Sequence, residues 1–572
     1  MTLTVDLYPS EQRVRMKGRY ALQNRSQQAI DRIHLLFLQS DRLQIDTLQF
    51  SQSAQIVTDD RPIGLRTYKL STPLAPQATL ALDFDLEIPT RGFTNSGSMT
   101  DVVYNGSFVN GQAVLPVVGY DERVELVTDR DRKKFGLAPK ERMRPRDDPV
   151  GLQRNGLAAD ADFINFDATV GTEPDQWAIA PGYLQREWTE NGRRYFHYRM
   201  DSPILNFFAF QSARYTVRSG KWNDVPIDVY YHAGHDYNVD RMIAATKAGL
   251  DYFTAAFGPY QHKQFRIIEF PRYQSFAQSF PNTIPYSESI GFIARVRDGD
   301  PDDIDYPYYV TAHELAHQWW GHQVPGADVQ GQTMLVETLA QYSALMVMKQ
   351  KYGDAKMRRF LRYELDRYLI GRSGEQKKEL PLSRVENQGY IHYRKGSLIM
   401  YALADYIGEA NLNRAIRAYR DDWAFKGPPY SSTLDLIAKI RAVTPAELQY
   451  VIDDFIDSIT LYDNRAQSAV AKPLPDGRYE VTLTVIAHKR KADDLGREDD
   501  APLNDLIDIG VLGADDEPLF LEKRRVDKEQ TSFTIVVDKR PARAGIDPYN
   551  KLIDRSPKDN TVAVTRSDKS DK

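Results

Sequence analysis

The chain contains no cysteine among its 572 residues. Disulfide bonds and thiolate zinc sites are therefore excluded, whereas cytosolic and extracytoplasmic locations both stay open. No apolar run approaches the roughly 18 residues of a membrane-spanning helix. The opening MTLTVDLYPSEQRV alternates polar and apolar residues and lacks the apolar core of a signal peptide. We expect a soluble chain, cytoplasmic, or extracytoplasmic if it is excised from a membrane protein.

The sequence also lacks an excess of positive charge. Its formal net charge of −5 argues against a nucleic acid as the main partner. Hydrophobic residues make up 42% of the chain, which is ample for buried cores. At 572 residues the chain should hold about three or four domains.

One stretch carries clear chemistry. It reads HELAHQWWGHQVPGADVQGQTMLVE and begins with the pattern H-E-x-x-H at His313. On a helix, His313 and His317 stand on one face, one turn apart, where two imidazoles can hold one zinc ion. Glu314 between them can act as general base toward a zinc-activated water. The chance alternative is a helix whose histidines are only surface or core groups.

A catalytic zinc site of this type needs a third protein ligand. Between Gln318 and Tyr352 the carboxylates are Asp328, in a Pro/Gly-rich stretch typical of a loop, and Glu337, in a stretch typical of a helix. A helix holds a ligand more rigidly, which favours Glu337. His322 is a rival, but five helical residues after His317 it would point around the helix.

These motifs resemble the zinc signature of the aminopeptidase N and leukotriene hydrolase family, which are thermolysin-like zinc metallopeptidases of the gluzincin type. The resemblance rests on HELAHQWWG followed by VETLAQY. Nineteen residues separate His317 from Glu337, one more than in the family, and we place the addition in the Pro325-Gly326 loop. The family's Asn-Glu-Gly-Phe is replaced by the four residues 336–339, Val-Glu-Thr-Leu.

Two further residues take roles that the resemblance implies. Tyr393 lies in Y-x-K-G, similar to the family motif whose tyrosine stabilises the oxyanion. Glu288 lies 25 residues before His313, where the family carries an edge-strand glutamate that binds the substrate α-amine. The alternatives are a packing tyrosine and a solvated carboxylate. Pro285 also removes an N–H that an edge strand could offer to a peptide.

The order of elements predicts an α+β multidomain chain. Short alternating runs indicate a saddle-like N-terminal β-sheet domain over residues 1–219, with one charged helix at 121–133. A mixed and then helical pattern indicates a thermolysin-like zinc catalytic domain over 220–460, including a helix at 238–257 and one at 445–459 capped by Thr444. Strands over 461–563 suggest an immunoglobulin-like β-sandwich, and 564–572 a disordered tail.

We therefore expect a zinc-dependent metallopeptidase with one zinc ion per chain, most simply an aminopeptidase acting on peptide substrates. The alternative is a non-catalytic or endopeptidase-type domain that binds a peptide or partner. The chain begins almost inside its first strand and lacks the family's large helical C-terminal domain, and in this it resembles peptidase-like portions of bacterial ABC-transporter permease fusions. A transporter partner or covalent fusion is the corresponding expectation, and the oligomeric state stays open.

Overall fold

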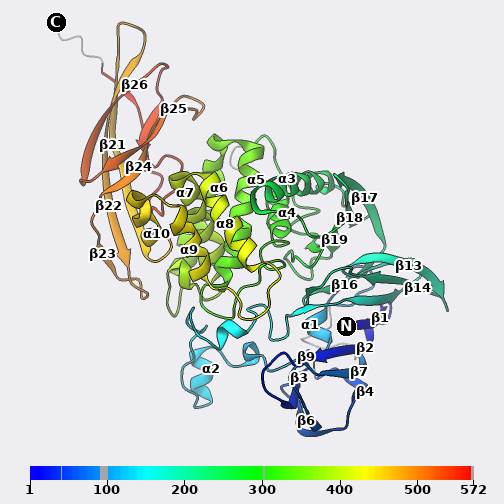
Figure 1. Cartoon of the computed structure of the whole chain (residues 1–572). Coiled ribbons are helices and arrows are strands. Elements are labelled where there is room, and N and C mark those ends of the chain that lie inside the picture. The colour runs from blue at the N-terminus through cyan, green and yellow to red at the C-terminus, as the bar shows by residue number, and fades with distance from the viewer. Residues whose placement is uncertain (40, 90–100, 301–302, 568–572) are drawn as a thin grey trace. The chain divides into compact units, whose positions relative to one another are not determined.

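The computed structural model describes residues 1–39, 41–89, 101–300 and 303–567. Strands dominate both ends of the chain and helices the part between them, so this is a multidomain α+β protein (Figure 1). The chain divides into two compact units. The first comprises Met1–Val296, Asp305–Asp328 and Trp423–Ser431, and the second Arg297–Ile304, Val329–Asp422 and Ser432–Lys572. The predicted segment 220–460 thus contributes residues to both units.

The largest sheet of the first unit has seven strands. Its order is β13 (Tyr183–Glu190), β14 (Arg193–Arg199), β11 (Asp167–Thr172), β1 (Thr2–Tyr8), β2 (Arg13–Gln23), β7 (Thr79–Ile88) and β4 (Gln44–Phe50). Strand β1 runs parallel to β11, and the other neighbours are antiparallel. Every second residue of β7 is buried, from Leu80 to Ile88, because alternate side chains of a strand face the same side. That apolar face forms the centre of the β-rich core.

Smaller sheets and short helices complete this region. One sheet has the order β5 (Ala54–Asp60), β6 (Leu65–Leu74), β3 (Ile30–Leu36) and β9 (Val117–Val118). Others join β12 (Trp177–Ile179), β16 (Ala209–Ala213) and β8 (Ser107–Asn110), and β10 (Phe163–Ile164) with β15 (Ile204–Leu205). The short helix α1 spans Gly111–Val114.

The prediction of a single charged helix over 121–133 is wrong. The structure has a 3₁₀ turn at Glu122–Val124 and a separate helix α2 at Asp129–Lys134. Thr128 is extended between them, and its hydroxyl accepts a hydrogen bond from the backbone N–H of Asp131 at 3.2 Å. Thr128 therefore starts a new helix, which a continuous charged pattern did not reveal.

A four-stranded sheet positions the site residues of the first unit. Its order is β17 (Tyr215–Trp222), β18 (Val225–His232), β19 (Phe265–Phe270) and β20 (Thr283–Ser287), with the last three parallel. Strand β17 crosses the predicted boundary between residues 219 and 220, because its hairpin with β18 draws it into this sheet. Helix α3 (Val239–Phe257) connects β18 to β19 and confirms the predicted helix there.

The helices of the second unit follow one another closely along the chain. They are α5 (Leu339–Tyr352), α6 (Asp354–Ser373), α7 (Gly396–Ile407), α8 (Glu409–Trp423), α9 (Thr433–Val443) and α10 (Gln449–Phe455). Two π-helical turns, η3 (Met334–Thr338) and η5 (Tyr390–Lys395), precede α5 and α7. Short 3₁₀ turns lie at η4 (Leu382–Arg384) and η6 (Ala446–Leu448).

The predicted role of Thr444 as an N-cap is wrong. Its hydroxyl donates to the Ile440 carbonyl at 2.8 Å, so Thr444 closes the C-terminus of α9. The helix predicted at 445–459 becomes the turn η6 and the shorter helix α10. A capping box occurs instead at the start of α9, where Ser432 and Asp435 satisfy each other's backbone N–H groups.

The C-terminal part forms two sheets. One has the order β23 (Glu498–Asp500), β22 (Tyr479–Ala492), β21 (Ile459–Pro473) and β29 (Thr565–Arg566), with β26 (Gln530–Val537) also paired to β22. The other has the order β25 (Pro518–Val526), β24 (Asp505–Leu512), β27 (Arg543–Ile546) and β28 (Thr561–Ala563). The prediction of a disordered tail at 564–572 is wrong for β29, which pairs with β21, and residues 568–572 of that prediction lie outside the described residues.

No helix in the described part of the chain combines the length and apolarity needed to cross a membrane.

Candidate metal-binding and catalytic site

The H-E-x-x-H stretch lies on helix α4 (Tyr306–Ala316) of the first unit. Asp305 caps this helix: its carboxylate accepts the N–H of Tyr308 at 3.3 Å and an Arg241 guanidinium N–H at 2.7 Å. Pro307 lies in the first turn, where a missing N–H costs nothing. The helix thus begins at a point fixed by the sequence, two turns before His313.

The two histidines converge at their Nε2 atoms. His313 Nε2 and His317 Nε2 lie 3.1 Å apart, and both side chains are buried. His317 Nδ1 donates to the Trp320 carbonyl at 2.9 Å, so its Nε2 carries the lone pair that a metal ion requires. Two zinc–nitrogen bonds of about 2.0–2.1 Å in a tetrahedral arrangement place their nitrogen atoms about 3.3 Å apart. The histidine pair fits this requirement.

The residues after His317 fasten the end of α4. Trp319 and Trp320 are fully buried, and Trp319 Nε1 donates to the carbonyl of Gly258 at the end of α3, at 3.0 Å. The buried Gln318 amide donates to Ser279 Oγ at 2.7 Å and to the Phe280 carbonyl at 2.9 Å. These contacts hold the chain reversal that brings the Trp320 carbonyl to His317.

The rival ligands have other roles. His322 is buried, and its Nε2 hydrogen-bonds the Ser279 carbonyl at 3.1 Å. Burial lowers the pKa of His322 to about 4, so this ring is neutral near pH 7. Asp328 lies in a bend whose backbone N–H donates to the Arg154 carbonyl at 3.0 Å. Neither residue belongs to a group of metal-ligating side chains among the described residues.

Glu337 and Tyr393 belong to the second unit, and each lies in a π-helical turn. Glu337 is partly buried in η3, and Tyr393 is partly buried in η5. Tyr393 does not lie in an extended segment, and its ring meets the His392 ring edge-on at 4.3 Å between centroids. The Thr338 hydroxyl donates to the His392 carbonyl at 2.6 Å and so joins the two turns.

The rest of the Y-x-K-G motif is structural. Lys395 is buried, and its ammonium lies 3.2 Å from Glu379, which also accepts from Tyr368 at 2.7 Å. Burial alone would raise the pKa of Glu379, but the charges of Lys395 and Arg372 and the Tyr368 hydroxyl lower it. Sequence reasoning did not identify this ion pair, although a charged residue within a buried helical stretch was a signal for it.

Gly396 brings α7 against η3. A Cβ atom at this position would lie 2.4 Å from Thr338 Oγ1 and 2.7 Å from its Cγ2. Such distances require the threonine to move, so glycine permits the close approach of the two segments. The lysine and glycine of the motif therefore hold the turns that carry Tyr393 and Glu337.

Glu288 follows β20 directly and lies in the first unit. Its Oε1 accepts the backbone N–H of Arg272 at 3.2 Å, and its Oε2 lies 3.9 Å from His235 Nδ1. The carboxylate side chain is 17% exposed, so a small ligand group can still reach it. Sequence reasoning singled out neither His235 nor its neighbours, although His232 and His235 stand three residues apart.

Strand β20 lies at the end of its sheet, but its outer edge is occupied by the chain itself. The N–H of Gln278 donates to the Pro285 carbonyl at 3.1 Å, and the N–H of Ser287 donates to the Phe276 carbonyl at 3.0 Å. Together with the missing N–H of Pro285, these bonds leave little main chain for an added peptide strand.

Comparison with known proteins agrees with this arrangement. The family described as Peptidase family M1 domain matches residues 241–456. Endoplasmic reticulum aminopeptidase 1 of Rattus norvegicus is 22% identical over 226 residues. That match covers 38% of this chain but 23% of the rat protein, so the chain corresponds to about a quarter of that relative.

Solved structures with the same fold come from Deinococcus radiodurans. An M1 zinc metallopeptidase from that organism aligns with a TM-score of 0.55 at 16% identity, covering 80% of this chain and 92% of that one. A mutant of an M1 zinc metallopeptidase from the same organism, bound to a Tyr-Ser-Ala substrate, aligns with a TM-score of 0.53 at 16% identity, covering 80% and 93%. At this identity the likeness establishes the fold.

The helix α4, the histidine pair and the matched family domain support a zinc metallopeptidase of the gluzincin type. The match of residues 241–456 to the Peptidase family M1 domain supports an aminopeptidase N-like family for this region, and this family implies a catalytic zinc ion.

Replacing Gly396 with alanine tests the packing of the two π-helical turns. We expect the free energy of unfolding to fall by about 1–3 kcal/mol, because the new methyl group overlaps Thr338. Chemical denaturation measures the change. Gly374→Ala is the matched control, since its Cβ would lie 3.6 Å from the nearest atom, the Gly371 carbonyl oxygen. A Thr338→Ala partner substitution should recover part of the loss; equal stability of Gly396→Ala and Gly374→Ala would contradict the packing argument.

Proposed function

We propose that the chain is a zinc-dependent aminopeptidase that releases residues from the N-terminus of peptides. The observation that carries this proposal is the approach of the His313 and His317 Nε2 atoms to 3.1 Å on the helix that also carries Glu314. The proposed zinc ligands are His313, His317 and Glu337. The other proposed roles are general base for Glu314, oxyanion donor for Tyr393 and amine anchor for Glu288.

The chemistry of the donor set supports the zinc assignment. Two imidazoles and one carboxylate are a combination typical of catalytic zinc sites. The hydrogen bond from His317 Nδ1 to Trp320 supplies the outer partner that orients a ligating ring. When bound, zinc would polarise the substrate carbonyl. It would also lower the pKa of water and so make it a better nucleophile toward that carbonyl.

The chain's own residues then handle the proton and the developing charge. Glu314 accepts the proton of the attacking water and passes it to the leaving amine. Tyr393 donates a hydrogen bond from its hydroxyl group to the oxyanion. As a neutral phenol it adds no charge of its own. Two π-helical turns joined by the Thr338 hydrogen bond support a common placement of Glu337 and Tyr393. This coupling favours an enzyme over a binding module, which needs neither a base nor an oxyanion donor.

Glu288 supports the choice of an aminopeptidase. A carboxylate can pair with the cationic α-amine of a peptide by a charge-assisted hydrogen bond. The endopeptidase alternative rests on strand β20. Pro285 lacks an N–H and the outer edge of the strand is already hydrogen-bonded to the chain itself, so β20 differs from an edge strand that is free to bind a peptide. A peptide held mainly by its amine needs less of that edge, and this favours the exopeptidase. Association with a membrane transporter, or covalent fusion to one, is a further proposal that rests on sequence resemblance.

Removing one proposed ligand at a time tests the metal assignment. Glu337→Ala should lose the zinc bound at this site, because two imidazoles alone hold the ion weakly. Asp328→Ala is the control, since this carboxylate of the preceding bend should leave zinc content unchanged. Elemental analysis of the purified protein gives zinc per chain. Loss of zinc in the Asp328 variant, with retention in the Glu337 variant, would reverse the assignment.

Conservative substitutions test the proposed catalytic residues. Glu314→Gln should keep zinc and lose peptide hydrolysis, because an amide cannot accept the proton. Tyr393→Phe should lower kcat more than it raises KM, by about 2.7–4 kcal/mol of transition-state stabilisation. Tyr390→Phe is the matched control: it lies in the same turn, but its hydroxyl donates to Glu375 at 3.0 Å. Steady-state kinetics with a peptide substrate measures these changes. An unchanged kcat for Glu314→Gln or for Tyr393→Phe would remove that residue from the mechanism.

Acetylated substrates test the direction of cleavage. A free α-amine is largely cationic near pH 7 and can pair with Glu288, whereas an acetylated amine cannot. We expect acetylation to abolish hydrolysis, and Glu288→Ala to raise KM for free-amine peptides. Chromatography of the products identifies which bond is cut. Equal cleavage of free and acetylated peptides would establish an endopeptidase and leave the zinc proposal intact.

A further inference from the structure

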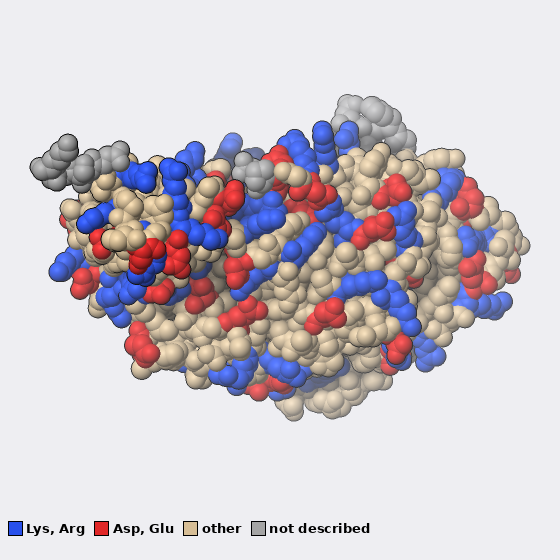
Figure 2. Space-filling model, turned by 90° about the horizontal axis from the view of Figure 1, so that it is seen from above, with Lys and Arg blue, Asp and Glu red and all other residues tan. Residues whose placement is uncertain are grey.

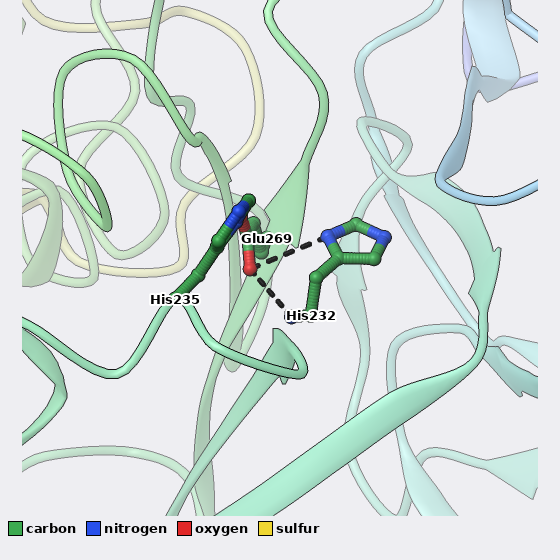
Figure 3. Close-up of side chains that lie close together, drawn as sticks. All are labelled: His232, His235 and Glu269. Atoms are coloured by element: carbon green, nitrogen blue, oxygen red, sulfur yellow. Dashed lines mark hydrogen bonds and ion pairs between the residues drawn. The ribbon is translucent and has the colours of Figure 1, made fainter.

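We propose that His232, His235 and Glu269 bind a second metal ion of the zinc type, in the first unit. The three side chains each offer one ligand atom, and these atoms lie within 4.8 Å of one another. Figure 3 shows a ring nitrogen of each histidine turned toward the Glu269 carboxylate. The inference does not depend on the proposed function.

A tight turn brings the two histidines to one carboxylate. The sequence His-Ala-Gly-His begins at His232, the last residue of strand β18. The N–H of His235 donates to the His232 carbonyl at 2.9 Å. Gly234 occupies the third position of this turn with φ of +90°, a conformation that glycine adopts without strain. Glu269 comes from the neighbouring parallel strand β19. Both strands are interior to the sheet, so the group rests on rigid elements.

The separation of His232 from Glu269 suits two ligands of one tetrahedral ion, whereas the His235–Glu269 contact is a hydrogen bond that a bound ion would replace. His235 Nδ1 lies 2.5 Å from Glu269 Oε1, and His232 Nδ1 lies 3.3 Å from Glu269 Oε2. The carboxylate also accepts the backbone N–H of His232 at 2.6 Å, which fixes its orientation. Neither ring nitrogen of His232 makes a hydrogen bond, although both atoms are buried. A metal ion would give a His232 nitrogen the partner that a buried polar atom normally has.

The charge balance favours a divalent cation. Glu269 is fully buried, and Glu288 adds a second carboxylate 3.9 Å from His235 Nδ1. In the described part of the chain, the ion-pair partners of these two carboxylates are histidines alone. With neutral imidazoles, Glu269 and the neighbouring Glu288 bring two negative charges, which one divalent ion balances. Burying an uncompensated carboxylate is costly, so ion binding would stabilise the fold.

The ligand types select the class of ion. Imidazole nitrogen suits zinc and its first-row neighbours, whereas magnesium and calcium prefer oxygen ligands throughout. The His235 side chain is 32% exposed, so an ion can reach this ligand from solvent. We therefore expect zinc, cobalt or nickel to bind and magnesium to compete poorly.

Zinc stoichiometry of the whole, untagged chain tests the site. The protein is stripped with chelator, loaded with zinc, separated from free metal and assayed for zinc per chain. We expect two equivalents in the parent protein, one in His235→Ala and one in His317→Ala. His488→Ala is the matched control, because this exposed histidine faces Glu529 at 3.5 Å and should leave both equivalents. Circular dichroism and thermal unfolding confirm that each variant is folded.

The outcomes separate the two sites. If the parent binds one equivalent that His317→Ala removes and His235→Ala retains, the group around Glu269 is a hydrogen-bonded cluster without metal and the proposal fails. If His235→Ala removes the single equivalent, the second site stands and the catalytic ligand assignment fails. Cobalt absorption bands in the His317→Ala protein that are lost on adding His235→Ala give an independent readout of imidazole coordination. Absence of such bands would likewise overturn the proposal.

Discussion

The proposed active site depends on the hydrogen bond between His317 Nδ1 and the Trp320 carbonyl. This bond decides which ring nitrogen carries the proton, and hence which one can bind a metal ion. The carbonyl reaches His317 because α4 ends there and the chain reverses over a buried tryptophan pair. The apolar packing of Trp319 and Trp320 is thus a condition for the chemistry of the histidines.

A similar dependence holds for the second unit. The buried Lys395–Glu379 pair and the close approach at Gly396 supply no chemistry themselves, but they fix two irregular turns. Irregular backbone is costly unless the surrounding contacts determine it, and π-helical turns often mark functional positions. The buried ion pair therefore serves to hold the shape of these turns. Removing one partner would leave an uncompensated buried charge.

Much of this arrangement follows from the sequence. The helix Val239–Phe257 and the histidine pair come from periodicity and spacing, which local physics dictates. The π-helical turns do not, because an α-helix and a π-helix share the same residue preferences. A π-helical turn contains one residue more than an α-helical turn. The residue added between His317 and Glu337 can therefore be placed either in η3 or in the Pro325-Gly326 loop. Thr444 shows a related ambiguity, since a threonine before proline can end one helix or start the next.

The short strand β29 has a practical consequence for shortened forms of this protein. Thr565 and Arg566 pair with Val470 and Ala471 and cover that part of the edge of β21. A truncation before Thr565 would leave these main-chain groups open to strands of other molecules, and exposed edges of this kind promote aggregation. Poor solubility of such a form would then report an uncovered edge, even with the catalytic region intact.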